Sequence, residues 1–460
     1  MAEVQADRRL VALRELLQRV FREPKVRRAM SHDLAPPKTQ AQWNGRPALA
    51  LEPTGCLAVV RRLMNWGYRP LRAEVNVSVG WRWVCGVYDQ HLPSFQTIRD
   101  REVLLSPATL RLILRTTVKL GRALGLTEVR RLRLDSTVTE TGIQYPTDSR
   151  LLDDAARVLS RWLKRAKKVV RPRRTQRSAF RNRTRQAHRL ARQIAQQSRR
   201  KGKNAGKISP KLYRQLVAVV TALVRQATQV RQWLKARTTA LAQKIAGQLE
   251  YFSGLAQQVM AQTERRVFQN EAVPATDKLV SLFEPHTAII RRGKAGSKET
   301  EFGHRVWLAE VDGGLLTEYV LRDGNPPDAD RVVPSVRQHR RLFGRWPIEV
   351  SGDRGTYSPE NEQLLKQLGV KRISLPQPGH TDAQRQRRQR QPWFKAAQRF
   401  RAGIEGRISQ LRRARCLDRC LNHGKPGLHR WIGWGLIANN LAQMALWVTQ
   451  RKSRLAQLLT

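Results

Sequence analysis

The order of apolar and charged positions predicts β-strands at several places along the chain. Residues 129–135 alternate between apolar and charged side chains, and the alternation stops at Asp135. A period of two is typical of a strand with one buried face. Residues 346–355 predict a second strand, which ends at Asp353, and residues 370–376 predict a third.

Two further alternating runs predict a β-hairpin. They cover residues 304–311 and 315–322 and are separated by Asp312-Gly313-Gly314. Glycines between two such runs favour a tight reversal of the chain. The hairpin should therefore lie between the strand of Asp135 and the strand of Asp353 in chain order.

Elsewhere the apolar residues recur every three or four positions, which predicts helices. Ser358-Pro359-Glu360 is a helix start, because a hydroxyl cap, a proline and an acid suit the first positions of a helix. We expect helices at 1–30, at 56–126 as several short ones, at 329–342 and from Trp393 onward, with a linker at 31–55 and a basic loop at 380–391.

Residues 150–270 form a block of their own. They contain 30 Lys and Arg against four acidic residues, a net charge of +26, and their apolar positions keep a helical spacing. The spacing breaks at residues 199–207, which contain two glycines. The pattern predicts two long helices that fold as a hairpin around this turn.

Residues 431–450 contain no charged side chain and are long enough to cross a bilayer. Asn439, Asn440 and Gln443 lie in the middle of the segment, however, and its tryptophans and aliphatic residues form one stripe. We therefore expect a buried helix of a water-soluble protein and no membrane partner.

The composition points to a polyanionic partner. The 460 residues include 87 Lys and Arg against 36 Asp and Glu, a formal net charge of +51. A charge of this size suits nucleic acid, or less well an anionic membrane, rather than a small-molecule substrate. The 40% hydrophobic content argues against a disordered chain.

The chain has four cysteines, Cys56, Cys85, Cys416 and Cys420, which are too few for a disulfide scaffold. Together with an N-terminus that does not read as a secretory signal, this predicts a reducing, cytoplasmic compartment. With a nucleic-acid partner, we expect the protein to be nucleoid-associated there. Cys416, Cys420, His423 and His429 could be forced into a zinc site, but their spacing matches no established finger and we favour a structural role.

The last long helix offers a third carboxylate to accompany Asp135 and Asp353. Glu405 is the only acid between Phe394 and Arg412, and Arg401, Glu405 and Arg412 share one face of the predicted helix. Two aspartates and a glutamate suit Mg²⁺ or Mn²⁺, and two such ions can promote in-line attack on phosphorus. These acids are the candidate catalytic and metal-binding residues.

Three stretches of the sequence resemble bacterial insertion-sequence transposases of the DDE class. They read LRLDSTVTETGIQYPTDS, IEVSGDRGTYSPEN and GIEGRISQLRRARCLDRCLNHG followed by RWIGWGLIANNL, and the resemblance extends over roughly residues 55–450. It is strongest to a loosely classified group with a DSTV…YPTDS motif. The resemblance implies an α/β, RNase H-like catalytic core in which Asp135, Asp353 and Glu405 are the catalytic triad.

The resemblance also implies a sequence signature around Glu405. Related transposases have Tyr, then Arg, Glu and Lys at fixed spacing, where this chain has Gln398, Arg401, Glu405 and Arg412. Arg and Glu match, Arg412 keeps the positive charge of the lysine, and Gln398 lacks the tyrosine hydroxyl. A homodimer on double-stranded DNA, at element ends and target, is implied as well.

We therefore predict three parts: an N-terminal helical DNA-binding region (1–126), an RNase H-like core (127–149 and 271–450) and a basic helical insertion (150–270). Arg354, Arg401 and Arg412 are candidate DNA contacts of the core, and Arg181, Arg183 and Arg185 of the insertion.

Two alternatives stay open on the sequence. One is a nuclease with the same core that never joins strands, and the other is a non-catalytic DNA-binding protein derived from a transposase. Some acids are expected to be caps, surface charges or loop residues: Glu140, Asp148, Asp153, Asp154, Asp323, Asp328 and Asp330.

Overall fold

The computed structural model describes residues 7–35, 49–88, 91–199, 209–291 and 300–458, with side chains as far as Arg451. The chain forms two compact units. The first comprises Met1–Gly142 and Gly303–Thr460, and the second is Ile143–Phe302. The second unit thus extends beyond the predicted insertion (150–270) at both ends, and the predicted N-terminal region (1–126) lies in the same unit as most of the sheet.

A mixed six-stranded sheet is the centre of the α/β architecture, in the order β2-β3-β1-β5-β6, with β4 also paired to β3. β1 is antiparallel to β3 and parallel to β5, and β5 is parallel to β6. The predicted mixed α/β class is confirmed at this level. The strands are Arg131–Glu140 (β1), Ala288–Arg291 (β2), Thr300–Val311 (β3), Leu316–Arg322 (β4), Glu349–Ser351 (β5) and Arg372–Ser374 (β6).

The predicted hairpin is formed by β3 and β4. Gly313 and Gly314 adopt φ values of +81° and +77°, which L side chains rarely adopt, so glycines are needed at this turn. Asp312 accepts hydrogen bonds from the amides of Glu128 (3.1 Å) and Arg131 (3.1 Å). The turn therefore also fixes the start of β1.

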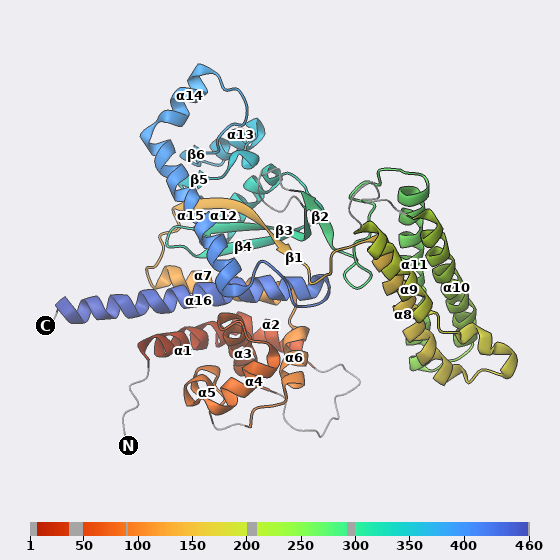
Figure 1. Cartoon of the computed structure of the whole chain (residues 1–460). Coiled ribbons are helices and arrows are strands. Elements are labelled where there is room, and N and C mark those ends of the chain that lie inside the picture. Colours follow the sequence, from red (N-terminus) through yellow and green to blue (C-terminus); the bar gives the residue numbers. More distant parts are fainter. Residues whose placement is uncertain (1–6, 36–48, 89–90, 200–208, 292–299, 459–460) are drawn as a thin grey trace. The chain divides into compact units, whose positions relative to one another are not determined.

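Helices of the first unit cover this sheet. α15 packs against β1, β5 and β6, whereas α7 and α16 pack against β4. α16 also contacts α1 and α3, and Figure 1 shows it between the sheet and the N-terminal helices. The helices of the first unit are Arg8–Phe21 (α1), Pro24–Leu34 (α2), Leu51–Leu63 (α3), Tyr68–Val77 (α4), Val79–Cys85 (α5), Phe95–Leu104 (α6), Pro107–Ala123 (α7), Val332–Phe343 (α12), Pro359–Gln367 (α13), Ala383–Arg390 (α14), Pro392–Arg415 (α15) and Gly424–Leu458 (α16).

The uncharged segment 431–450 is the middle of α16. Trp434 and Ile437 are fully buried, and Asn440 pairs with the backbone of Leu316 through both its oxygen (3.0 Å) and its nitrogen (2.9 Å). The asparagine thus satisfies two backbone groups of β4 inside the core. Within the described residues, no helix combines the length and hydropathy needed to cross a membrane.

The second unit corrects the prediction of two long helices. Its described residues form four α-helices: Asp148–Val170 (α8), Thr184–Ser198 (α9), Pro210–Lys235 (α10) and Ala240–Thr263 (α11). The C-cap of α8 is Arg171, which has a φ of +50° and is followed by Pro172, and α11 begins after its N-cap Thr239. The predicted turn at 199–207 lies almost entirely outside the described residues.

A second correction concerns residues 380–391, which are not a loop. They contain α14, whose N-cap Asp382 accepts a hydrogen bond from the amide of Arg385 (2.6 Å). Arg385 and Arg388 both pair with Glu362 of α13, so charge pairs rather than an apolar stripe hold this helix.

Candidate functional site

The two predicted aspartates lie beside each other where β5 ends next to β1. The prediction that the first strand ends at Asp135 is wrong, because β1 continues to Glu140 and stays paired with β3 beyond this residue. β1 and β5 pair in parallel up to Arg133 and Ser351, and each strand then reaches an aspartate two residues later. Neighbouring strands are about 4.8 Å apart, so Asp135 and Asp353 follow side by side. Asp353 begins a short 3-10 turn, Arg354–Thr356 (η6), which leads the chain away from the sheet.

Asp135 is buried, and its surroundings oppose its ionisation. One carboxylate oxygen accepts the amide of Ser136 (2.7 Å) and the other pairs with Arg401 (2.9 Å). Burial raises the pKa of Asp135 to about 6; Arg401 opposes this rise, and the negative charges of Asp353 and Asp328 add to it. Asp135 therefore shares its environment with two other carboxylates.

Asp328 is the residue that the sequence analysis missed, because it was assigned to an exposed loop. It begins a 3-10 turn, Asp328–Arg331 (η5), and is only 5% exposed. Its carboxylate accepts hydrogen bonds from Ser136 (2.7 Å) and Arg305 (2.8 Å). Burial raises the pKa of Asp328, and the charge of Asp353 contributes. Asp328 follows an Asn-Pro-Pro loop, and no sequence pattern there distinguishes this buried aspartate from its exposed neighbours.

Arg401 connects the third predicted acid to the first. From α15, one nitrogen of its guanidinium contacts Asp135 and another contacts Glu405 Oε1 at 2.7 Å. Glu405 lies one helical turn beyond Arg401, and its side chain is 61% exposed. The structure therefore brings Asp135 and Glu405 to the same guanidinium, with Glu405 on the solvent side.

A buried ion network holds α15 on the sheet. Glu310 of β3 is completely buried and pairs with Arg133 of β1 (2.7 Å) and with Arg407 of α15 (3.1 Å). Arg133 also donates to the carbonyl of Phe400 (2.7 Å). A Cβ at Gly403 would meet this guanidinium, which would have to shift, so the glycine leaves room for Arg133 under α15. The network fixes the turn of α15 that carries Arg401 and Glu405.

The two remaining signature positions also bind the sheet. The side-chain nitrogen of Gln398 contacts the carbonyls of Gly352 (3.3 Å) and Ser374 (2.9 Å), which end β5 and β6. Arg412 donates to Thr137 Oγ1 (3.0 Å) in β1. Gln398 thus connects α15 to the backbone just before Asp353, and a DNA contact by Arg412 stays a prediction.

The carboxylates offer oxygen atoms to a cation. Asp353 Oδ1 and Asp328 Oδ1 are buried and make no hydrogen bond among the described residues, and both acids act on the pKa of Asp135. Unpaired carboxylate oxygens are the ligands that Mg²⁺ and Mn²⁺ prefer. As the side chains lie here, no three His, Cys, Asp or Glu of the described ranges form a metal-sized group, and Arg401 supplies the positive charge beside Asp135 and Glu405.

The predicted arginine contacts fall in both units. Arg354 follows Asp353 directly and is exposed. Arg181, Arg183 and Arg185 surround the start of α9 in the second unit, where Arg181 and Arg185 are exposed and Arg183 is half-buried. Their contact with DNA stays a prediction.

The YPTDS segment has its own structural role at the start of α8. Thr147 caps the helix by accepting the amide of Arg150 (3.3 Å). Asp148 is buried and contacts Gln262 (3.0 Å) and Arg266 (3.1 Å) at the end of α11. Asp148 is therefore neither a simple cap nor a surface charge, because it joins the two ends of the helical unit.

The cysteines near the end of α15 have structural contacts. Cys416 ends the helix in the left-handed conformation, and its carbonyl accepts a hydrogen bond from the indole of Trp431 (2.9 Å). Cys420 Sγ lies 3.3 Å from the carbonyl of Asn422.

Comparisons with protein-family models, curated proteins and solved structures found no match to this chain. The features that bear on function are the acids beside the end of β5, the arginine that joins Asp135 to Glu405, and the basic charge of the chain.

Proposed function

We propose that this protein is a DNA transposase of the DDE class with an RNase H-like core. The observation that carries the proposal is the meeting of Asp135, Asp353 and Asp328 beside the end of β5, with Glu405 joined to Asp135 through Arg401. The sheet supports the fold, because the strand of the first aspartate is central, with an antiparallel hairpin on one side and the strand of the second aspartate on the other.

The proposed reaction is cleavage of a phosphodiester at the ends of an insertion element, followed by attack of the 3′-OH on target DNA. Asp135, Asp353 and Glu405 would hold two Mg²⁺ or Mn²⁺ ions, which when bound supply charge neutralisation and an activated oxygen nucleophile. Asp135 must be ionised for this role, and Arg401 favours its ionised form. Asp328 and Ser136 orient the strand that carries Asp135.

Double-stranded DNA is the proposed partner, bound by two copies of the chain. The net charge of +51 and the +26 of residues 150–270 support a polyanion. Lys and Arg along a helical unit contact phosphates more often than bases, so this charge should contribute affinity rather than sequence preference.

The acids are tested by single substitutions. Asp135→Ala, Asp353→Ala and Glu405→Ala should each abolish Mg²⁺-dependent cleavage of DNA carrying the element's ends, while DNA binding in a gel-shift assay persists. The matched control is Asp323→Ala, since Asp323 is an exposed acid next to β4 that pairs with Lys425 on the surface. Cleavage at the wild-type rate by Glu405→Ala would remove Glu405 from the reaction.

The basic unit is tested by its salt dependence. Replacing Arg181, Arg183 and Arg185 by Gln should weaken binding to cognate and random DNA by similar factors. Each lost phosphate contact should reduce the slope of log affinity against log salt by about 0.9. Lost discrimination with unchanged affinity for random DNA would show that these arginines read bases.

A second candidate is a DNA-binding protein that descends from a transposase without its activity. It is favoured by Arg401, which already provides a counter-charge to both Asp135 and Glu405. The same assay separates the candidates. DNA binding without cleavage in Mg²⁺ or Mn²⁺ supports the second candidate, and cleavage without joined product supports a nuclease.

A further inference from the structure

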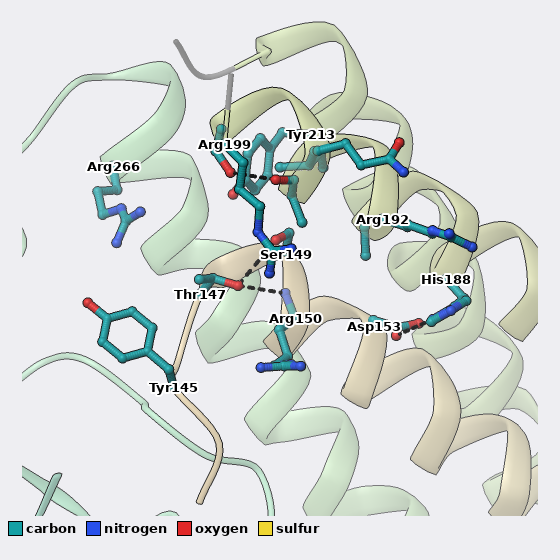
Figure 2. A pocket seen from close by; sticks show the side chains of 15 residues that line it. Tyr145, Thr147, Ser149, Arg150, Asp153, His188, Arg192, Arg199, Tyr213 and Arg266 are labelled. Carbon is teal, nitrogen blue, oxygen red and sulfur yellow. Dashed lines mark hydrogen bonds and ion pairs between the residues drawn. The ribbon is translucent and has the colours of Figure 1, made fainter. Parts of the chain in front are cut away.

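The second unit contains a hollow of about 610 Å³ that the proposed reaction does not use. It lies where α8 begins, beside α9, α10 and the turn after α11. Figure 2 shows Tyr145 and Arg266 on one side, Arg192 and His188 on the other, and Thr147, Ser149 and Arg150 between them. Its lining therefore includes most of the YPTDS segment that the sequence analysis singled out.

The hollow is lined by positive charge without matching acids. Among the residues that the structure describes, the guanidinium groups of Arg150, Arg192 and Arg199 make no hydrogen bond or ion pair. The one acid of the lining, Asp153, is paired with His188 at 3.0 Å. Three free guanidinium groups on one concave surface provide donors for an anion, and guanidinium geometry matches a phosphate.

Local contacts hold several of the side chains that line the hollow in place. Thr147 Oγ1 lies 3.3 Å from Ser149 Oγ and accepts the amide of Arg150, so the first turn of α8 is fixed. Tyr213, only 4% exposed, forms the floor beside Ser149. The exposed ring of Tyr145 at the rim is steadied edge-on by Phe302, 5.6 Å away.

We propose that this hollow binds the phosphate of a single nucleotide, with the guanidinium groups of Arg150, Arg192 and Arg199 on the phosphate and the base near Tyr145. Pockets of roughly 300–1,000 Å³ enclose ligands of this size, and bases stack on aromatic side chains. The nucleotide can be free or an unpaired member of a DNA strand. The inference goes beyond the proposed cleavage reaction and does not depend on it.

The test compares two double variants of the full chain. Arg150→Gln with Arg192→Gln changes the hollow, whereas Arg161→Gln with Arg189→Gln makes the same charge change on exposed positions of the same helices, α8 and α9, outside it. The probes are a deoxynucleoside monophosphate, the same deoxynucleoside without phosphate, and a single-stranded tetranucleotide. Equilibrium dialysis at 0.3 M salt suppresses diffuse binding to the basic surface.

We expect the variant Arg150→Gln with Arg192→Gln to bind the monophosphate or the tetranucleotide at least about tenfold more weakly than the wild type, as for the loss of one charged hydrogen bond. The control variant should bind these probes like the wild type. Binding of the free monophosphate identifies a free nucleotide as a ligand, and binding of the tetranucleotide alone identifies an unpaired nucleotide of a strand. Equal losses in both variants, or equal affinity for the deoxynucleoside and its monophosphate, would overturn the proposal, whatever the outcome of the cleavage assays.

Discussion

Replacing Glu310 by Gln should loosen the contact between α15 and the sheet. Glu310 is completely buried in β3, and its carboxylate is the shared partner of Arg133 and Arg407. The amide keeps the shape of the side chain and one accepting oxygen but removes the charge. Two guanidinium groups, one from β1 and one from α15, then lose their only carboxylate partner among the described ion pairs.

The size of the effect follows from the burial of the network. Removing one member of a buried ion pair destabilises proteins by about 3–5 kcal/mol, since the remaining charge stays desolvated. The retained oxygen of Gln can still accept one hydrogen bond, which places this change near the lower end, at about 3 kcal/mol. Locally protected amides should then open about 100-fold more often.

Amide hydrogen exchange followed by mass spectrometry measures this opening segment by segment. Peptides from β1, β3 and α15 should exchange about 100-fold faster, while those from α8 to α11 are unchanged. The control is Glu128→Gln, in which the same chemical change affects an exposed pair with Arg130 and should alter stability by less than about 1 kcal/mol. Equal exchange in the two variants would refute the reasoning.

Three further predictions concern other contacts. Since burial raises the pKa of Asp135 to about 6, the folded state holds this proton more tightly than the unfolded chain, and the stability from Asp135 is lost as pH rises through about 6. In EDTA, Asp135→Asn should therefore be more stable than the wild type at pH 8, by up to about 3 kcal/mol, but not at pH 4. Urea unfolding measures this difference, and midpoints that differ equally at both pH values would contradict the prediction. Gln398→Ala should cost about 1–2 kcal/mol and speed exchange in β5 and α15, whereas unchanged exchange there would show that its contacts contribute nothing. Leu223→Ala, in the core of the second unit, should cost about 2–5 kcal/mol by urea unfolding and speed exchange only in α8 to α11, and faster exchange in β1 would argue against independent units.

The strands and the triad candidates could be predicted because their signals are local. Alternation marks β1, two glycines with positive φ mark the β3–β4 turn, and a cap followed by proline marks the start of α13 at Ser358. Asp135 and Asp353 stood out because each was predicted to end a strand, although in the structure β1 continues past Asp135 to Glu140. That they belong to neighbouring parallel segments follows only from the sheet order, which the sequence does not specify.

The burial of Asp328 and the helix α14 were not predicted, because both depend on contacts between residues that are distant in the sequence. Asp328 is buried because the chain after β4 returns to Ser136 and Arg305, and no local pattern encodes that return. α14 was assigned to a loop since it has no apolar period. Its helix depends on Asp382 at the cap and on Glu362 of another helix.

Some arginines of this chain form ion pairs with buried acids, whereas others are exposed, and this difference is relevant to DNA binding. Six acids of the first unit are buried, each against an arginine, so they do not reduce the positive charge of the surface. Buried pairs are screened by salt much less than exposed charges, so salt should weaken a phosphate contact long before it weakens these pairs. The buried acids of the first unit and their partners are Glu102 with Arg61, Asp135 with Arg401, Glu310 with Arg133, Glu349 with Arg131, Asp328 with Arg305, and Glu362 with Arg385. The arginines in these buried pairs therefore help to hold the elements that carry Asp135 and Glu405. Exposed arginines such as Arg181 and Arg354 remain available to bind a polyanion.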